Sequence, residues 1–185
     1  AMNLNVNICG INFKNPIIAA SGTYGFGKEY ENFYDISELG GISVKGLTPE
    51  QRQGNPPPRI AETSMGILNS VGLQNPGVDA FLDNEWPRLK EKNLITIANI
   101  AGKTINDYCY MAERIGNAGI PMIEMNISCP NVKQGGMAFG ASPESVYEIT
   151  KQVRKHCNTV LIVKLSPNTA DIAANAKAAE YAGAD

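Results

Sequence analysis

The segment 124–136 carries the residue types of this chain that are best suited to chemistry. It places a cysteine, Cys129, between two asparagines, Asn126 and Asn131, and two glycines close it. An apolar run over residues 121–125 leads into it. This pattern predicts a buried strand that ends by presenting the thiol on a sharply turned loop.

A cysteine in this position can serve in three ways. It can pack as an inert buried thiol, attack as a nucleophile that needs a neighbouring base, or act as a general base toward a carbon acid. Asn126 and Asn131 can orient a polar ligand but cannot take its proton. The single histidine, His156, falls late in a predicted helix, where a solvent-exposed position is expected. We therefore favour a functional Cys129 that acts without a histidine partner, as either nucleophile or base.

Composition restricts the classes of protein to consider. The chain has 185 residues, 43% hydrophobic and 18% charged, which is ordinary for a soluble globular protein. Its net charge of −2 gives no basic surface for nucleic acid, and no apolar run reaches the roughly 18 residues of a membrane span. None of the four cysteines forms a C-x-x-C pair, which argues against a metal site, an iron–sulfur site or a disulfide framework in this chain. With no secretory leader, a reducing cytoplasm is the expected location.

Five apolar runs alternate with helix-like segments, after a short hairpin predicted over residues 4–14. The predicted strands cover residues 17–20, 42–45, 94–98, 121–125 and 160–165. The predicted helices cover residues 28–39, 78–92, 104–117 and 169–182, with another that starts at Ser142 and has proline at its first position. This alternation predicts a parallel α/β sheet with both faces covered.

The segment 47–77 interrupts the alternation and is rich in proline and glycine. Loops of this length inside a compact domain are usually functional or disordered. Six apolar residues predict an ordered loop that packs on the fold: Ile60, Met65, Ile67, Leu68, Val71 and Leu73.

Polar residues at the ends of the five predicted strands help to choose between two architectures. An open doubly wound sheet and a (β/α)8 barrel both fit, but residues 22–27 lack the G-x-G-x-x-G spacing of a dinucleotide-binding sheet. In a barrel, strand ends converge on the carboxyl-terminal face, where catalytic residues lie. The strand-end residues are Ser21, Lys45, Asn99, Asn126 and Lys164. We therefore predict a (β/α)8 TIM barrel with a polar pocket at that face.

Only five of the eight strand–helix units of such a barrel are predicted in this chain. A full barrel needs about 250 residues. Residues 1–185 are therefore expected to form a single domain, the N-terminal portion of a TIM barrel in a longer protein. With two lysines, several asparagines and no acid at the strand ends, the pocket would suit a planar carboxylate-bearing molecule or an anionic reduced flavin.

The segment 126–136, N-I-S-C-P-N-V-K-Q-G-G, closely resembles the catalytic loop of the dihydroorotate dehydrogenase family. Four other stretches match the family in the same order: residues 15–22 (NPIIAASG), 43–48 (SVKGLT), 54–59 (GNPPPR) and 67–77 (ILNSVGLQNPG). The resemblance covers essentially the whole chain. Residues 132–136 are more similar to the NAD-dependent class 1B branch than to the fumarate-using class 1A branch.

The resemblance implies an FMN-containing barrel that oxidises (S)-dihydroorotate to orotate in de novo pyrimidine biosynthesis. It implies that Cys129 is the general base that removes the C5 proton, while a hydride passes from C6 to flavin N5. The implied substrate contacts are Lys45, Asn69, Ser70, Val71, Gly72, Leu73, Asn126 and Asn131. The implied FMN contacts are Ser21, Lys45, Gly46, Asn99, Asn126 and Lys164, with Lys164 near the N1–C2 carbonyl edge of the ring.

The resemblance also implies that electrons reach NAD through a partner subunit that carries FAD and a [2Fe–2S] cluster. The expected assembly is a catalytic homodimer within a heterotetramer, without a membrane or nucleic-acid partner. Two other hypotheses stay open. One is another FMN-barrel pyrimidine oxidoreductase, similar to dihydropyrimidine dehydrogenase, and the other is a truncated fragment without catalytic activity.

Overall fold

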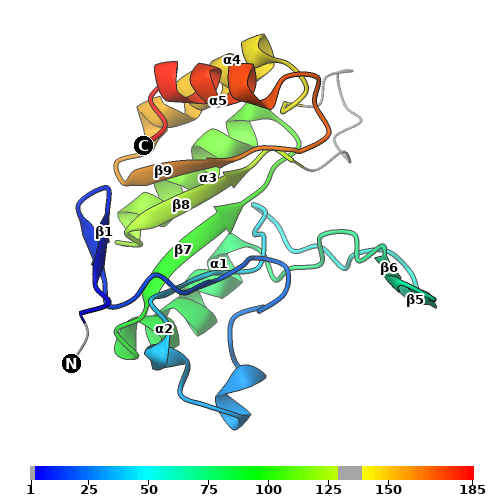
Figure 1. Ribbon diagram of the computed structural model, residues 1–185, viewed down its shortest axis with the longest axis vertical. Helices are drawn as coiled ribbons and strands as arrows, with labels where there is room; N and C mark the ends of the chain where they lie inside the picture. Colours follow the sequence, from blue (N-terminus) through cyan, green and yellow to red (C-terminus); the bar gives the residue numbers. More distant parts are fainter. Residues whose placement is uncertain (1–2, 129–138) are drawn as a thin grey trace.

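The structure is a computed structural model that describes residues 3–128 and 139–185. Its centre is a five-stranded parallel sheet in the order β3–β4–β7–β8–β9, accompanied by two separate hairpins (Figure 1). The sheet strands are β3 (Ile18–Ala19), β4 (Gly41–Ser43), β7 (Ile95–Ile100), β8 (Met122–Asn126) and β9 (Val160–Lys164). The hairpins pair β1 (Val6–Ile8) with β2 (Ile11–Phe13), and β5 (Ile60–Thr63) with β6 (Gly66–Asn69). Parallel neighbours in chain order are what successive β–α units of a barrel produce.

Helices connect the sheet strands and cover one face of the sheet (Figure 1). They are α1 (Val78–Ala80), continued through the π-helical turn η3 (Phe81–Glu85) into α2 (Trp86–Glu91), then α3 (Ile105–Asn117), α4 (Pro143–His156) and α5 (Ile172–Tyr181). Thr104 and Ser142 cap α3 and α4 with complete capping boxes. No helix in the described part of the chain is long and apolar enough to span a bilayer.

The two faces of the sheet bury different partners, because successive side chains of a strand point to opposite faces. On one face, Ile123 and Leu161 pack with helix residues in the main core. On the other, Ile97 and Met122 form a second core with Phe13 of the β1–β2 hairpin. The hairpin thus covers the amino-terminal half of this second face. The carboxyl-terminal half of the same face carries the polar strand ends.

The parallel α/β sheet and most of its elements are confirmed, with small shifts at their ends. The single helix predicted over residues 28–39 is wrong. Two separate 3₁₀ turns stand there, η1 (Tyr30–Asn32) and η2 (Ile36–Glu38). Asp35 between them is extended, and its side chain accepts a hydrogen bond from the Ser37 backbone at 2.9 Å. This local side-chain bond begins a new turn instead of continuing the first one.

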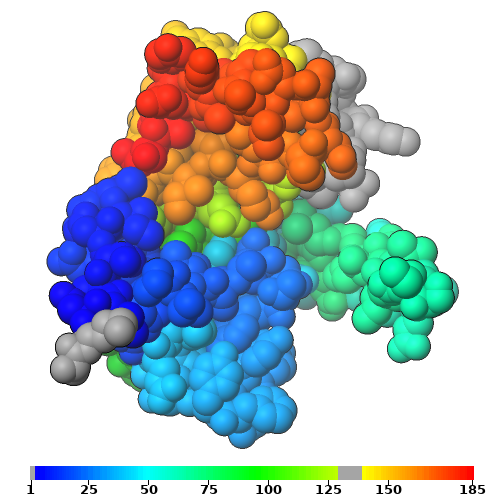
Figure 2. Space-filling model, in the orientation of Figure 1, coloured from blue at the N-terminus to red at the C-terminus, as the bar shows by residue number. Residues whose placement is uncertain are grey.

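The packed loop predicted over residues 47–77 is only partly right. Its middle forms the β5–β6 hairpin, which projects away from the sheet (Figures 1 and 2). The apolar residues expected to pack there are exposed: Ile60, Met65, Ile67 and Leu68. Arg59 orders the base of the hairpin instead, since its guanidinium donates to Gln74 Oε1 at 2.6 Å and to the Gln53 carbonyl at 2.9 Å. Polar contacts, and not apolar burial, therefore anchor the β5–β6 hairpin.

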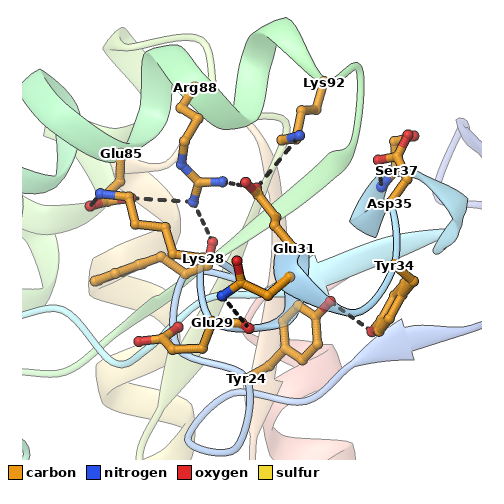
Figure 3. A network of polar contacts seen from close by, with 12 residues as sticks. Tyr24, Lys28, Glu29, Glu31, Tyr34, Asp35, Ser37, Glu85, Arg88 and Lys92 are labelled. Atoms are coloured by element: carbon orange, nitrogen blue, oxygen red, sulfur yellow. Dashed lines mark hydrogen bonds and ion pairs between the residues drawn. The ribbon is translucent and has the colours of Figure 1, made fainter.

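A network of charged side chains joins the segment after β3 to helix α2 (Figure 3). Arg88 of α2 pairs with Glu31 and donates to the Phe26 carbonyl, and its side chain is only 21% exposed. In the same segment, the Gly25 carbonyl accepts a hydrogen bond from the Lys45 backbone at 3.0 Å. The network therefore supports the chain that borders Lys45.

Arg88→Ala should lower the free energy of unfolding by about 2 kcal/mol, because the Phe26 carbonyl loses its donor and Glu31 loses a partner in a largely buried place. Urea denaturation followed by circular dichroism measures this loss. Arg114→Ala is the matched control, since Arg114 lies 2.9 Å from Asp79 but the two side chains are 45% and 63% exposed. The control should keep the wild-type midpoint, because exposed pairs contribute little. Equal shifts of the urea midpoint in both variants would contradict the view that the burial of an ion pair, and not the distance between its atoms, determines how much it stabilises the fold.

Candidate functional site

Three of the predicted strand-end residues meet on the second face of the sheet. Ser21 follows β3, Asn99 lies in β7, and Lys164 ends β9. Asn99 Nδ2 donates to Ser21 Oγ at 3.3 Å, and Lys164 Nζ donates to the same oxygen at 3.5 Å. Parallel strands thus bring side chains that are distant in the sequence into one polar group.

A fourth member of this group, Glu124 of β8, contradicts the expectation that no acid stands at the strand ends. Its Oε1 accepts hydrogen bonds from Ser21 Oγ at 3.1 Å and from Asn99 Nδ2, and it lies 3.9 Å from Lys164 Nζ. The Glu124 side chain is 16% exposed, and a carboxylate this enclosed requires compensating donors. The sequence held a signal, because a residue two positions before Asn126 lies on the same face of the strand. We call Ser21, Asn99, Glu124 and Lys164 the strand-end cluster.

Asn99 has one polar atom without a partner among the described residues. The residue is 1% exposed, its Nδ2 is engaged by Glu124 and Ser21, and its Oδ1 is buried without a hydrogen bond. A Cβ added at Gly46 would lie 2.9 Å from this oxygen and 3.0 Å from Leu73 Cδ1. Buried acceptors are normally satisfied. A side chain at position 46 would therefore collide with this acceptor, and glycine lets the backbone lie close to an oxygen that still needs a donor, such as an N–H group of a ligand.

Asn126 offers a hydrogen-bond donor, whereas Asn99 offers an acceptor. It ends β8, is 9% exposed, and stands in register with Lys164 of β9. Its Oδ1 accepts hydrogen bonds from the Ser128 backbone at 3.2 Å and from Ser128 Oγ at 2.6 Å, while its carbonyl accepts from Tyr108 OH at 2.8 Å. Because a backbone N–H can only donate, the amide oxygen is committed to Ser128. The Nδ2 group, which makes no hydrogen bond within residues 3–128 and 139–185, is left as a donor for a ligand.

Lys45 follows β4 and borders a cavity. Together with Tyr24 and other residues of the segment 22–33, it lines a hollow of about 410 Å³. Burial and the hydrogen bond with Tyr34 raise the pKa of Tyr24 far above its ordinary value, so this phenol stays neutral near pH 7. No ion pair involves Lys45 in the described part of the chain, which leaves its ammonium available to an anionic ligand.

The loop residues predicted to contact substrate divide into two groups. The half-buried ones are Val71, Gly72 and Leu73. Leu73 lies near Gly46, since a Cβ added at that glycine would be 3.0 Å from Leu73 Cδ1. Asn69 ends β6 and is exposed, and Ser70 Oγ accepts a hydrogen bond from Asn55 Nδ2 at 2.8 Å. Within the described residues, no hydrogen bond links Asn69 or Ser70 to the strand-end cluster, so both lie at the base of the β5–β6 hairpin.

Asn75 holds this loop in place, and the sequence prediction missed it. The residue is 4% exposed. Its Oδ1 accepts hydrogen bonds from the backbone of Thr48 at 3.1 Å and of Gly77 at 2.9 Å, and its Nδ2 donates to the Leu73 carbonyl at 2.9 Å. The signal was the Asn-Pro-Gly sequence of residues 75–77, in which asparagine commonly bonds nearby backbone.

Asn75→Ala should lower the free energy of unfolding by about 2–3 kcal/mol, since three backbone groups lose their partner in a buried place. Urea denaturation measures this loss. Asn84→Ala is the control, because Asn84 is exposed and, among the described residues, its Nδ2 donates to the Ala80 carbonyl alone, at 2.8 Å. If both variants unfolded at the same urea concentration, Asn75 would not be the residue that holds the loop.

Cys129 and Asn131 lie outside the described residues, so their roles stay predictions. Of the described cysteines, Cys9 is exposed and Cys109 and Cys157 are buried, and all three are free thiols. Burial raises the pKa of the Cys109 thiol, which keeps it protonated near neutral pH. Among residues 3–128 and 139–185, no group of three or more His, Cys, Asp or Glu side chains could hold a metal ion.

The polar groups at the strand ends fit a flat heterocycle that has both donors and acceptors. Asn99 offers a buried acceptor, Asn126 offers a donor, and Lys45 and Lys164 offer positive charge. The ring of oxidised flavin has one imide N–H between two carbonyl groups. The residues present therefore fit FMN.

Comparison with known proteins gives the family of the chain. The family model for dihydroorotate dehydrogenase matches residues 3–185. The chain is 54% identical over 184 residues to "Dihydroorotate dehydrogenase B (NAD(+)), catalytic subunit" of Thermoanaerobacter pseudethanolicus and 55% identical to the protein of the same name from Caldicellulosiruptor saccharolyticus. Each match covers 100% of this chain and 61% of the relative, so the chain spans less than two thirds of these relatives' length.

A solved structure shares the fold. It is described as DHODH in complex with ferulenol from Eimeria tenella, and it matches with a TM-score of 0.78 and 24% sequence identity. The match covers 99% of this chain and 58% of that chain, as expected of a sheet that forms part of a barrel. The family model supplies the assignment that the fold alone could not: this chain belongs to the dihydroorotate dehydrogenase family.

Proposed function

We propose that this chain supplies the strand-end pocket of an NAD-dependent dihydroorotate dehydrogenase catalytic subunit, which oxidises (S)-dihydroorotate to orotate. The relatives at 54% and 55% identity carry that name. The observation that carries the proposal is the buried Oδ1 of Asn99, which has no partner among the described residues and lies beside Gly46, where a Cβ would not fit. An acceptor in this setting calls for a ligand N–H, and the flavin imide provides one.

In this proposal, FMN is held by Ser21, Lys45, Gly46, Asn99, Asn126 and Lys164. When bound, FMN supplies the acceptor for a hydride. Lys164 places positive charge near the ring, where negative charge would develop. The Asn126 Nδ2 group, held by the Ser128 contacts, donates a hydrogen bond to substrate or ring.

The chemistry on the substrate removes two hydrogens from adjacent carbons. Cys129, as a thiolate, takes the C5 proton, while the hydrogen on C6 leaves with its electron pair. The C5=C6 double bond of orotate forms from the electrons of the broken C5–H bond. Lys45, Asn131 and the Asn69–Leu73 segment complete the substrate contacts of this proposal.

We further propose a catalytic homodimer within a heterotetramer. The words "catalytic subunit" in the relatives' names support a partner subunit. That partner would carry FAD and a [2Fe–2S] cluster and pass electrons to NAD.

The test is anaerobic reduction of the flavin. The complete protein should show the visible absorbance of bound FMN, and adding dihydroorotate should bleach it. Bleaching by dihydrouracil but not by dihydroorotate would favour an enzyme similar to dihydropyrimidine dehydrogenase. A colourless protein that takes up no FMN on titration would favour the non-catalytic alternative.

A further inference from the structure

We propose that Glu124 is a positioning residue of the FMN site, whose carboxylate orients the Asn99 amide so that Oδ1 faces the ligand. This inference rests on the proposed function, because it names FMN as the ligand. None of the contacts expected for FMN or substrate includes Glu124.

The sheet itself brings the two groups together. Asn99 and Glu124 are direct neighbours in the β7–β8 ladder, so their side chains leave the same face side by side. On the other side of Glu124, the ladder neighbour in β9 is Ile162, which is apolar and cannot donate. Asn99 is therefore the adjacent sheet residue whose side chain can donate to the carboxylate, and its Nδ2 does so.

The carboxylate excludes the opposite amide orientation. A carboxylate only accepts hydrogen bonds, so turning the Asn99 amide over would set Oδ1 against Glu124 Oε1 and lose the bond from Nδ2. Ser21 could not favour one orientation of the Asn99 amide over the other, because a hydroxyl both donates and accepts hydrogen bonds. In the structure, Ser21 Oγ donates to Glu124 and accepts from Asn99 and from Lys164.

The orientation matters to the ligand because of the atom that then lies beside Gly46. With Glu124 in place, that atom is the acceptor Oδ1, which has no partner in the described part of the chain. With the amide turned over, an NH₂ group would face the imide N–H of FMN, donor against donor. One hydrogen bond to the ring would be lost and a buried donor left unsatisfied.

A double-mutant cycle on FMN binding by the complete protein tests the coupling. Apo-protein is titrated with FMN, and the dissociation constant is measured from the change in flavin fluorescence. We expect Glu124→Leu to weaken FMN binding about tenfold in the wild-type background, the equivalent of one hydrogen bond. In the Asn99→Ala background, the same substitution should weaken it by less than about twofold, because no amide remains to be oriented.

Glu124→Gln provides the conservative rescue. Its carbonyl oxygen can still accept from Asn99 Nδ2, so FMN affinity should stay within about threefold of wild type. Thr150→Val is the control, because Thr150 is a buried polar residue of helix α4 whose hydroxyl has no partner among the described residues. It should leave FMN affinity unchanged.

Two results would overturn the inference while leaving the proposed function standing. One is an equal effect of Glu124→Leu with and without Asn99, and the other is a loss in Glu124→Gln as large as that in Glu124→Leu. A wild-type protein that binds no FMN would instead overturn the proposed function and, with it, this inference.

Discussion

Cys129→Ala in the complete protein is expected to slow the reduction of bound flavin by dihydroorotate about 10²–10⁴-fold at neutral pH, the usual contribution of a general base. Alanine cannot take the C5 proton. The strand-end cluster offers no ready substitute, because the Glu124 Oε1 atom already accepts from Ser21 and Asn99 and lies beside Lys164. Anaerobic stopped-flow absorbance measures the rate, and the spectrum before mixing shows whether FMN is still bound.

Cys9→Ala is the matched control for this substitution. Cys9 is an exposed thiol in the turn of the β1–β2 hairpin, which packs against the amino-terminal half of the sheet face. Its removal should leave the rate at the wild-type value. Near-wild-type reduction in Cys129→Ala would show that another group is the base.

Lys164→Ala is expected to weaken FMN binding about 100-fold and to make the flavin potential more negative. Hydrogen bonds to charged groups contribute about 1.5–3 kcal/mol, and each 1.4 kcal/mol is a factor of ten in affinity. Without the ammonium, the Glu124 carboxylate 3.9 Å away loses its counter-charge, and the remaining negative charge opposes reduction of the ring. Titration with FMN measures the affinity, and equilibration with a reference dye measures the potential.

Lys177→Ala is the control, since Lys177 is an exposed lysine on the outer helix α5. It should change neither quantity. An unchanged affinity and potential in Lys164→Ala would rule out the place assigned to Lys164 beside the ring.

The convergence of Ser21, Asn99 and Lys164 could be predicted from the sequence for a simple physical reason. The carboxyl ends of parallel strands lie at one edge of a sheet, so polar residues that end successive apolar runs must come close together. Glu124 was missed because it lies inside such a run, not after it. The alternation of strand side chains would have identified it, since Glu124 and Asn126 share a face.

Two other errors arose where burial depends on distant parts of the chain. The apolar character of Ile60, Met65, Ile67 and Leu68 predicts packing, yet these residues of the β5–β6 hairpin are exposed to solvent. Local composition does not show which surface, if any, lies opposite a segment. The segment 28–39 has helical spacing of its apolar residues, but the Asp35–Ser37 bond starts a separate turn there. A side chain that bonds nearby backbone, as Asp35 does, can end a helical turn even where the spacing of apolar residues predicts that the helix continues.

The second core and the strand-end cluster lie on one face of the same strands. On each of three strands, a residue of the second core is followed two positions later by a residue of the cluster. The three pairs are Ile97 and Asn99, Met122 and Glu124, and Ile162 and Lys164. The apolar residue of each pair packs in the second core with the β1–β2 hairpin, and the polar residue belongs to the strand-end cluster. Substitutions at positions 97, 122 and 162 should therefore act mainly on the stability of the fold, whereas joint substitutions at positions 99, 124 and 164 that keep the buried carboxylate paired, or remove it, should change which ligands bind.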